Sequence, residues 1–407
     1  MSALAALAAT GAFAQSSVTL YGVADIAYGA HKTTGTGTNS IKSSGVMDGG
    51  NAGSRIGFRG TEDLGGGLRA EFVVEQGIAP TNDEVFGTRT GAGGHQVDGF
   101  SAAGGAAAVS GSAGAYSNGT NRQTYLGLSS KDLGTLRIGY QYTNVYELAT
   151  LSGYALGSEG VQGADKAHLH MQAQAGGTRA NAITYISPSF SGLTVRAQFG
   201  SGSAGRDTFE QNTANAASNL SVDKAVRMSF MAKYDAGPLS AALAYTDNKI
   251  TQSVRAAGSQ TINAYGAISA PLPAASATTN AAERAAKLIQ IGASYDFGMA
   301  KVGLTINDGE NGGTGSSTQI SSFTGYNLSV SAPFGALVPF ASLGKAKTKN
   351  DTTSVITEDY SLSQFGARYS LSKRTTAYLM AGTTKNNAPG VAWTKDSKTV
   401  VGVAHSF

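Results

Sequence analysis

The sequence predicts an all-β protein: a 16-stranded antiparallel transmembrane β-barrel with short periplasmic turns and long external loops. Runs of about ten residues alternate apolar and polar side chains along most of the chain, and short and long connections alternate between them. No run of roughly 18 apolar residues is present to form a membrane-spanning helix. Because a barrel strand needs only about 9–11 residues, the lack of such a run does not exclude a transmembrane β-barrel.

The first fourteen residues differ from the rest of the chain. Residues 1–14 are small and apolar and end in Ala12-Phe13-Ala14, which fits the small-x-small rule for signal-peptide cleavage. The basic start of a signal peptide is missing, and a buried first helix is the alternative. We interpret 1–14 as a signal-peptide remnant and 15–407 as the exported barrel.

Composition restricts the chemistry. The 407 residues include 55 Gly, no Cys and a net charge of +4. Disulfides and thiolate chemistry are therefore excluded, and the dispersed charge does not indicate nucleic acid. His168-x-His170 is half of a possible metal site, but no third ligand is suggested nearby. No Ser/His/acid arrangement is recognisable, so we expect no enzyme activity, no metal and no cofactor.

Sixteen alternating runs are expected to be strands. They are 17–29, 53–62, 68–79, 122–130, 134–142, 179–187, 192–200, 224–235, 238–249, 286–296, 299–308, 322–332, 336–347, 358–370, 374–384 and 397–407. The second run shows the pattern clearly: Arg55 and Arg59 lie on one face, with Ile56 and Phe58 on the other.

The connections between these runs fall into two strictly alternating classes. The short ones are turn-like and include Asp63–Gly67, Lys131–Gly134, Asp235–Pro238, Asp296–Gly298 and Leu371–Lys373. The long ones are 30–52, 80–121, 143–178, 201–223, 250–285, 309–321, 348–357 and 385–396. A soluble sandwich has no reason to keep its long loops at one end, whereas an outer-membrane barrel has short periplasmic turns and long external loops.

A closed membrane barrel determines the direction of the strand face that bears Arg55 and Arg59. In hydrocarbon every backbone polar group must be paired, so the sheet has to close on itself. If the apolar faces contact lipid, the polar faces line the interior, and sixteen strands leave an aqueous channel there. Arg55 and Arg59 are therefore predicted to point inward, into water.

Several stretches together resemble the trimeric general porins of Gram-negative outer membranes, especially the anion-selective branch in beta-proteobacteria. They are "SSVTLYGVADIAY", "SRIGFRGTEDLGGGLRAEF", "RQTYLGLSSKDLGTLRIGYQYT", "NAITYISPSFSGL", "YDFGMAKVG", "YSLSKRTTAYL" and "VGVAHSF". The resemblance spans nearly all of residues 15–407. It implies a homotrimer in the outer membrane that forms a water-filled diffusion channel for small hydrophilic solutes and ions, with a preference for anions.

The resemblance also implies a narrow point in the channel. In such porins the third long loop, here 143–178, folds into the barrel and faces basic residues on the wall. The positions that we assign to this constriction are Arg55, Arg122, Arg179, Glu75 and Arg59 on the wall and Glu147, Glu159 and Asp165 on the loop. Tyr140 departs from the pattern, because it stands where an arginine is common and would remove one wall charge.

The chain ends in an aromatic residue. Val401, Val403, His405 and Phe407 share one strand face, and Phe407 resembles the signal that the outer-membrane assembly machinery reads. Two other functions stay open: a barrel with a plugged lumen that serves mainly as an adhesin or structural anchor, and a soluble all-β binding protein.

Overall fold

The computed structural model describes residues 17–35, 38–78, 80, 121–151, 179–203, 219–255, 282–314, 320–390 and 394–407. The expected signal-peptide remnant 1–14 lies outside this part of the chain. So do residues 81–120 of the second long loop and 152–178 of the third. Within the described residues, no helix is long and apolar enough to cross a lipid bilayer.

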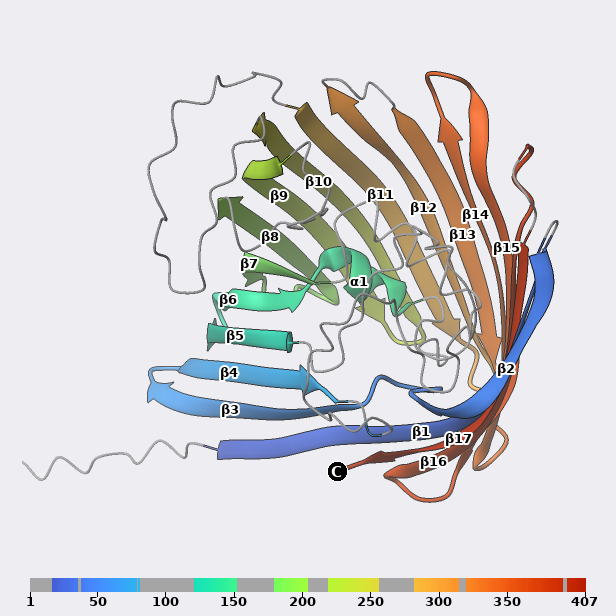
Figure 1. Cartoon of the computed structure of the whole chain (residues 1–407). Helices are drawn as coiled ribbons and strands as arrows, with labels where there is room; N and C mark the ends of the chain where they lie inside the picture. Colours follow the sequence, from blue (N-terminus) through green and yellow to red (C-terminus); the bar gives the residue numbers. More distant parts are fainter. Residues whose placement is uncertain are drawn as a thin grey trace, which may run out of the picture.

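Seventeen strands and one short helix make up the described structure (Figure 1). The elements are β1 (Ser17–Gly35), β2 (Thr38–Asp48), β3 (Arg55–Gly65), β4 (Leu68–Gly77), β5 (Asn121–Ser130), β6 (Gly134–Tyr142), α1 (Asn144–Ala149), β7 (Arg179–Ile186), β8 (Leu193–Ser203), β9 (Asn219–Ala236), β10 (Leu239–Arg255), β11 (Ala282–Asp296), β12 (Lys301–Thr314), β13 (Ser321–Ser331), β14 (Leu337–Asn350), β15 (Val355–Ser370), β16 (Thr375–Asn386) and β17 (Thr394–Ser406).

The sheet closes into a barrel with sixteen strand positions. From β3 to β17, each strand pairs antiparallel with the next, and β17 pairs with β1 from Val23↔Ser406 to Gly35↔Thr394. On its other side, β1 pairs first with β3 and then with β2. Because β2 and β3 share one position beside β1, the seventeen strands confirm the predicted 16-stranded barrel.

The strands extend further toward the long connections than the sequence predicted. The expected loop 30–52 is largely a hairpin of β1 and β2, and the expected loop 348–357 is only a four-residue turn between β14 and β15. Both predictions were wrong for the same reason. In these segments Ser, Thr, Lys and Gly predominate and the few apolar residues do not alternate regularly, so the side-chain pattern fades while the backbone ladder continues.

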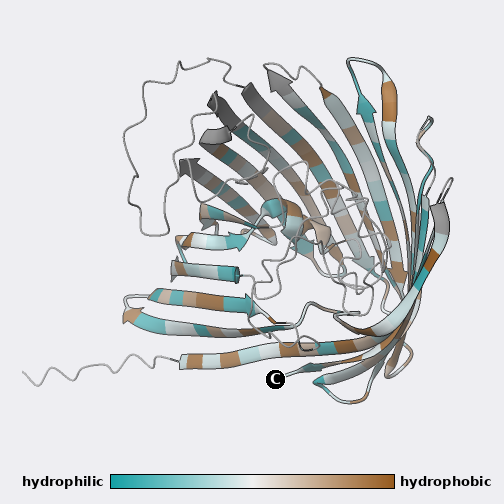
Figure 2. Ribbon diagram, in the orientation of Figure 1, coloured by the Kyte–Doolittle hydropathy of each residue, from teal (hydrophilic) through white to brown (hydrophobic). Residues whose placement is uncertain are grey.

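The barrel has apolar side chains outside and polar side chains inside. Outward-facing Leu126, Phe365 and Ile138 are 70%, 64% and 57% exposed. Gln198 and Asn307 are buried on the inner face. Figure 2 shows hydrophobic and hydrophilic segments interspersed along many of the strands. This reverses the usual polarity of a water-soluble protein and leaves an apolar surface that suits lipid.

Helix α1 lies inside the ring of strands (Figure 1). It begins directly after β6, where the Thr143 hydroxyl oxygen accepts a hydrogen bond from the Tyr146 amide at 3.3 Å and caps the helix. Val145 packs in a buried cluster with Leu288 and Phe323, and Leu148 packs in another with residues of β9 and β10. The start of the third long connection is therefore fixed against the inner wall.

Candidate functional site

The arginines of β3 lie on the inner face of the barrel. Arg55 and Arg59 share this face with Gly57, which pairs with the buried Glu75 of β4. Phe58, on the opposite face, is 48% exposed on the outside. The inward direction predicted from the alternation is the one observed, because neighbouring residues of a strand point to opposite sides of the sheet.

Glu75 is the centre of a charged cluster on this wall. Its Oε1 atom lies 2.8 Å from Arg122 Nε, and its Oε2 atom lies 3.6 Å from Arg55 Nε. The Tyr21 hydroxyl donates to Oε2 at 3.0 Å, and the Arg59 guanidinium carbon lies 5.1 Å from the centre of the Tyr21 ring. One buried carboxylate therefore holds two arginines, and Tyr21 connects them to a third.

Arg122 reaches this cluster through an irregularity in β5. Tyr125 and Gly127 face inward, and simple alternation from them would turn Arg122 outward. However, Glu75 pairs with Gln123 while the next residue of β4, Gln76, pairs with Asn121. Arg122 is thus an extra residue in its strand, and such a bulge redirects the side chain inward.

Tyr142, at the end of β6, pairs with Arg179 in the strand register and joins it to Arg122. Simple alternation would turn this last pair outward, but the contacts of Tyr142 with Arg122 and with Tyr146 of α1 hold it at the inner side. Its hydroxyl oxygen accepts from Arg122 Nη2 at 3.0 Å and from Arg179 Nη2 at 3.4 Å. The Arg179 guanidinium also lies 4.9 Å from the Tyr142 ring centre, and this ring stacks on Tyr146 of α1 at 4.2 Å. We did not identify Tyr142 from the sequence. Its position between β6 and the third long connection is the signal that could have indicated it.

The first loop acid is paired with a wall arginine that the sequence analysis missed. Glu147 of α1 lies 3.0 Å from Arg196 Nη1 of β8. Arg196 also donates to the Tyr142 carbonyl at 2.7 Å, and Gln198 donates to the same carbonyl at 3.1 Å. Glu147 therefore neutralises Arg196 directly. The other two loop acids in the assignment, Glu159 and Asp165, lie outside the described residues.

Among the described residues, this wall carries an excess of positive charge. The linked cluster contains five arginines, Arg55, Arg59, Arg122, Arg179 and Arg196, and two carboxylates, Glu75 and Glu147. Arg137 and Glu71 on the same wall form a neutral pair at 2.6 Å. Full ionisation leaves three positive charges. Tyr140 does not change this balance, because it pairs with Asn181 and shares the outward side with the exposed Leu136 and Ile138. The expectation that Tyr140 removes an inner charge was wrong.

Phe407 lies at the seam where the barrel closes. Its amide donates to the Gly22 carbonyl, and the Gly22 amide donates to the Phe407 carbonyl, both at 3.1 Å. The ring covers Gly22 so closely that a Cβ atom there would collide with Phe407 Cζ. Val401 and Val403 lie on the same strand face, as predicted, and are 53% and 46% exposed on the outside.

Known proteins share this architecture. A profile of the family described as "Gram-negative porin" matches residues 2–389. The outer membrane porin protein 32 of Delftia acidovorans is 30% identical over 92% of this chain and 86% of its own length. An outer membrane porin protein of Bordetella pertussis is 28% identical over 100% of this chain and 98% of its own.

Solved structures share the fold at lower identity. The anion-selective porin from Comamonas acidovorans has a TM-score of 0.63 and 24% identity, covering 97% of this chain and 100% of that one. The trimer form of OmpT from Vibrio cholerae has a TM-score of 0.57 and 12% identity, covering 95% and 99%.

Proposed function

The chain belongs to the Gram-negative porin family, and on that premise we propose that its arginine cluster makes the channel anion-preferring. As a member of this family, the protein lies in the outer membrane of a Gram-negative bacterium and forms a water-filled diffusion channel for small hydrophilic solutes and ions. We place the constriction at the wall of β3–β8, with residues 143–178 as the constriction loop.

One observation carries the proposed selectivity: the linked cluster on this wall holds five arginines and two carboxylates among the described residues, and the further pair on the wall, Arg137 with Glu71, is neutral. Arginine stays protonated at any physiological pH, so this positive charge is fixed. A narrow aqueous passage with low-dielectric walls focuses such a field, and rows of Arg or Lys are a general means of selecting anions. The similarity to a porin described as anion-selective supports the same direction.

The position of α1 supports the constriction loop. The helix leaves the wall at Tyr142, packs through Leu148 against β9 and β10, and presents Glu147 to Arg196. The loop therefore begins by crossing part of the interior. The hydrogen bonds from Arg122 and Arg179 to the Tyr142 hydroxyl connect the first residue before the loop to the arginine cluster of the proposed constriction.

The test is the zero-current potential of the reconstituted protein in a KCl gradient. Arg122→Ser/Arg179→Ser should shift this potential toward cation preference, because two positive charges are lost. The matched control is Arg137→Gln/Glu71→Gln, which removes a neighbouring ion pair of 2.6 Å without changing the net charge. An unchanged potential in the first variant would place these arginines outside the constriction. Absence of conductance steps in the wild-type protein would instead indicate a plugged barrel.

We also propose a homotrimer inserted through recognition of the C-terminal strand. The relative described as a trimer form supports the first part, and the position of Phe407 at the closing seam supports the second. Unboiled gel samples should migrate as an oligomer that becomes a single chain on boiling. A monomer band in both lanes under mild detergent would contradict the trimer.

A further inference from the structure

The chain leaves the barrel wall between β2 and β3. Strand β1 pairs with β2 as far as Asp48 and with β3 from Arg55 onward. Only Ala24 and Asp25 of β1 lie between these two pairings, whereas the facing chain has residues 49–54. Because so short a stretch of β1 cannot pair with all of them, most of this segment has to bulge out of the sheet. We call residues 49–54 the inner segment.

Asp25 holds the inner segment inside the barrel. This residue shares the inner face of β1 with Ala27, while Ile26 between them is 43% exposed on the outside. The Asp25 Oδ2 atom accepts hydrogen bonds from the amides of Asn51 at 2.8 Å and Ala52 at 2.6 Å. Because the carboxylate points inward, the segment that donates to it lies on the inner side of the wall.

Tyr378 of β16 completes this attachment from two strands away. Its hydroxyl donates to Asp25 Oδ1 at 2.5 Å and accepts from the Gly50 amide at 3.0 Å. The side chain reaches Asp25 by crossing Gly402 of β17, its partner in the strand register. A Cβ atom at Gly402 or at Gly50 would collide with the Tyr378 hydroxyl. Both glycines are therefore needed for this close approach.

The surroundings of Asp25 indicate why an aspartate stands there. The residue is 0% exposed, and no lysine or arginine in the described part of the chain lies within ion-pair distance of it. Burying a carboxylate without a cation is costly unless hydrogen bonds compensate. Here the donors are one hydroxyl and two amides that lost their strand partners when the chain left the sheet. Packing of the wall alone would favour an apolar residue, so the carboxylate serves the inner segment.

The inner segment also holds an arginine of the cluster. Its last residue, Ser54, directly precedes Arg55, and the Ser54 hydroxyl oxygen accepts from the Asp25 amide at 3.0 Å. Arg55 Nη1 donates to the Gly53 carbonyl at 2.9 Å, while Arg55 Nε lies 3.6 Å from the Glu75 carboxylate. Arg55 is thus fixed between the inner segment and the buried carboxylate of the cluster.

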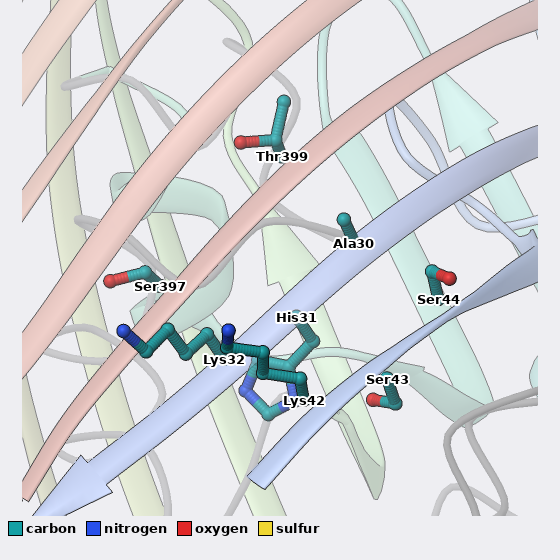
Figure 3. A pocket seen from close by; sticks show the side chains of 8 residues that line it. All are labelled: Ala30, His31, Lys32, Lys42, Ser43, Ser44, Ser397 and Thr399. Atoms are coloured by element: carbon teal, nitrogen blue, oxygen red, sulfur yellow. The ribbon is translucent and has the colours of Figure 1, made fainter. Parts of the chain in front are cut away.

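The inner segment covers a part of the wall that is open elsewhere along β1. Nearer the long-connection end, where β1 runs between β2 and β17, a hollow of about 500 Å³ is lined by residues that include Ala30, Ser43 and Thr399 (Figure 3). At Asp25 the wall is covered instead. Residues 51–53 are half-buried, so part of their surface faces the lumen.

We propose, on the basis of the constriction placed above at the wall of β3–β8, that the inner segment forms a second side of this constriction. Asp25 is its positioning residue: it holds the inner segment in the lumen and, through the Gly53 carbonyl, fixes Arg55. The channel is then narrowed by two inward stretches of chain, the inner segment and the third long connection, on either side of the arginine cluster.

Thiol labelling tests whether the inner segment lines the channel, since the chain has no cysteine of its own. Ala52→Cys should react with the anionic reagent 2-sulfonatoethyl methanethiosulfonate, and the single-channel current in a planar bilayer should then fall. The zero-current potential in a KCl gradient should fall as well, because the added charge cancels one of the three excess positive charges. The cationic trimethylammonium analogue should lower the current by its bulk and leave the anion preference intact.

The matched control is Ile26→Cys, which lies next to Asp25 on the outward face. Exposure to either reagent should leave its current unchanged. An Ala52→Cys protein that does not react, or that reacts without loss of current, would overturn the proposal. Loss of current depends only on the position of the segment. It is therefore independent of the Arg122→Ser/Arg179→Ser test, whose failure would remove the proposed selectivity instead.

Tyr378→Phe tests the positioning role of Asp25 without changing the net charge. Hydrogen exchange of the peptide that contains the inner segment, followed by mass spectrometry, should become about tenfold faster, as expected for loss of one hydrogen bond to a charged group. The zero-current potential should decrease, because Arg55 is no longer fixed. Asp25→Asn should accelerate exchange further, since it weakens all three hydrogen bonds to the carboxylate.

Tyr185→Phe is the control for loss of a tyrosine hydroxyl, because Tyr185 donates to the Leu133 carbonyl at the short-turn end at 2.9 Å. It should change neither the exchange of the inner segment nor the potential. A tyrosine that only supports the wall would leave the potential of Tyr378→Phe equal to that of the wild type. That result, or unchanged exchange in Tyr378→Phe, would overturn the positioning role.

Discussion

Replacing Arg59 with Gln should lower the anion preference of the channel by a measurable step. Arg59 is exposed on the inner face, and no described carboxylate lies within ion-pair distance of it. The change therefore removes one positive charge without leaving a buried acid unpaired. The charge excess of this wall falls from three units to two.

The size of the effect follows from a screened Coulomb estimate. Three charges about 8 Å from an ion on the channel axis change its free energy by about 1.6 kcal/mol in water, which screening at 0.1 M salt reduces to about 0.7 kcal/mol. Anions are then enriched and cations depleted about threefold each. A tenfold KCl gradient should give a zero-current potential of about 43 mV in the wild type and about 31 mV in Arg59→Gln.

A planar lipid bilayer is the assay, with Arg59→Lys as the control. The lysine keeps the charge and loses only the planar contact with Tyr21, so its potential should match the wild type. The reasoning is refuted if Arg59→Gln stays within error of the wild type. It is equally refuted if Arg59→Lys shifts as far as Arg59→Gln, because the cause would then be shape rather than charge.

Three further variants test other parts of the structure. Glu75→Gln removes a carboxylate from the cluster, so the potential in the same gradient should rise to about 50 mV; a fall would disprove the charge count. Deletion of Phe407 should lower surface levels, measured by labelling of intact cells, and leave single-channel conductance unchanged; normal levels would show that this residue is not the assembly signal. Leu148→Ala should cost about 2–5 kcal/mol of packing free energy where α1 meets the wall and increase open-channel current noise. Noise equal to the wild type would mean that the packing of Leu148 does not hold the loop.

The barrel was predictable because two patterns repeat around the whole sheet: the alternation of apolar and polar side chains, and the alternation of short and long connections. Strands such as β6 and β13 match their predicted runs to within one residue, since a membrane strand must keep one apolar face over its whole span. The β1–β2 hairpin was missed because Thr38–Asp48 has no such face to reveal it. Its strand pairing depends on backbone hydrogen bonds, which leave little trace in side-chain alternation.

The wall arginines were predictable as residues, but their contacts were not. The alternation of side chains along the strand was sufficient to predict that Arg55 and Arg59 point inward, because they lie within a regular strand. Arg122 depends on a bulge that follows from the pairing of Glu75 with Gln123, and a single strand's sequence does not encode its partner's register. Arg196 was missed because its importance comes from Tyr142 and Glu147, which approach it only when the third connection turns inward.

The β1–β17 seam has a consequence for how the barrel forms. Apart from this seam, the β1–β3 pairing and the contacts of α1, the strand pairings join segments that follow one another along the chain, whereas Val23↔Ser406 joins residues about 380 positions apart. Closing a flexible chain of that length costs about 5 kcal/mol of entropy, several times the cost of a tight hairpin. Formation of the seam is therefore expected to come last in folding. A chain truncated before β17 would expose two unpaired edges, on β16 and β1, each able to recruit strands from other molecules.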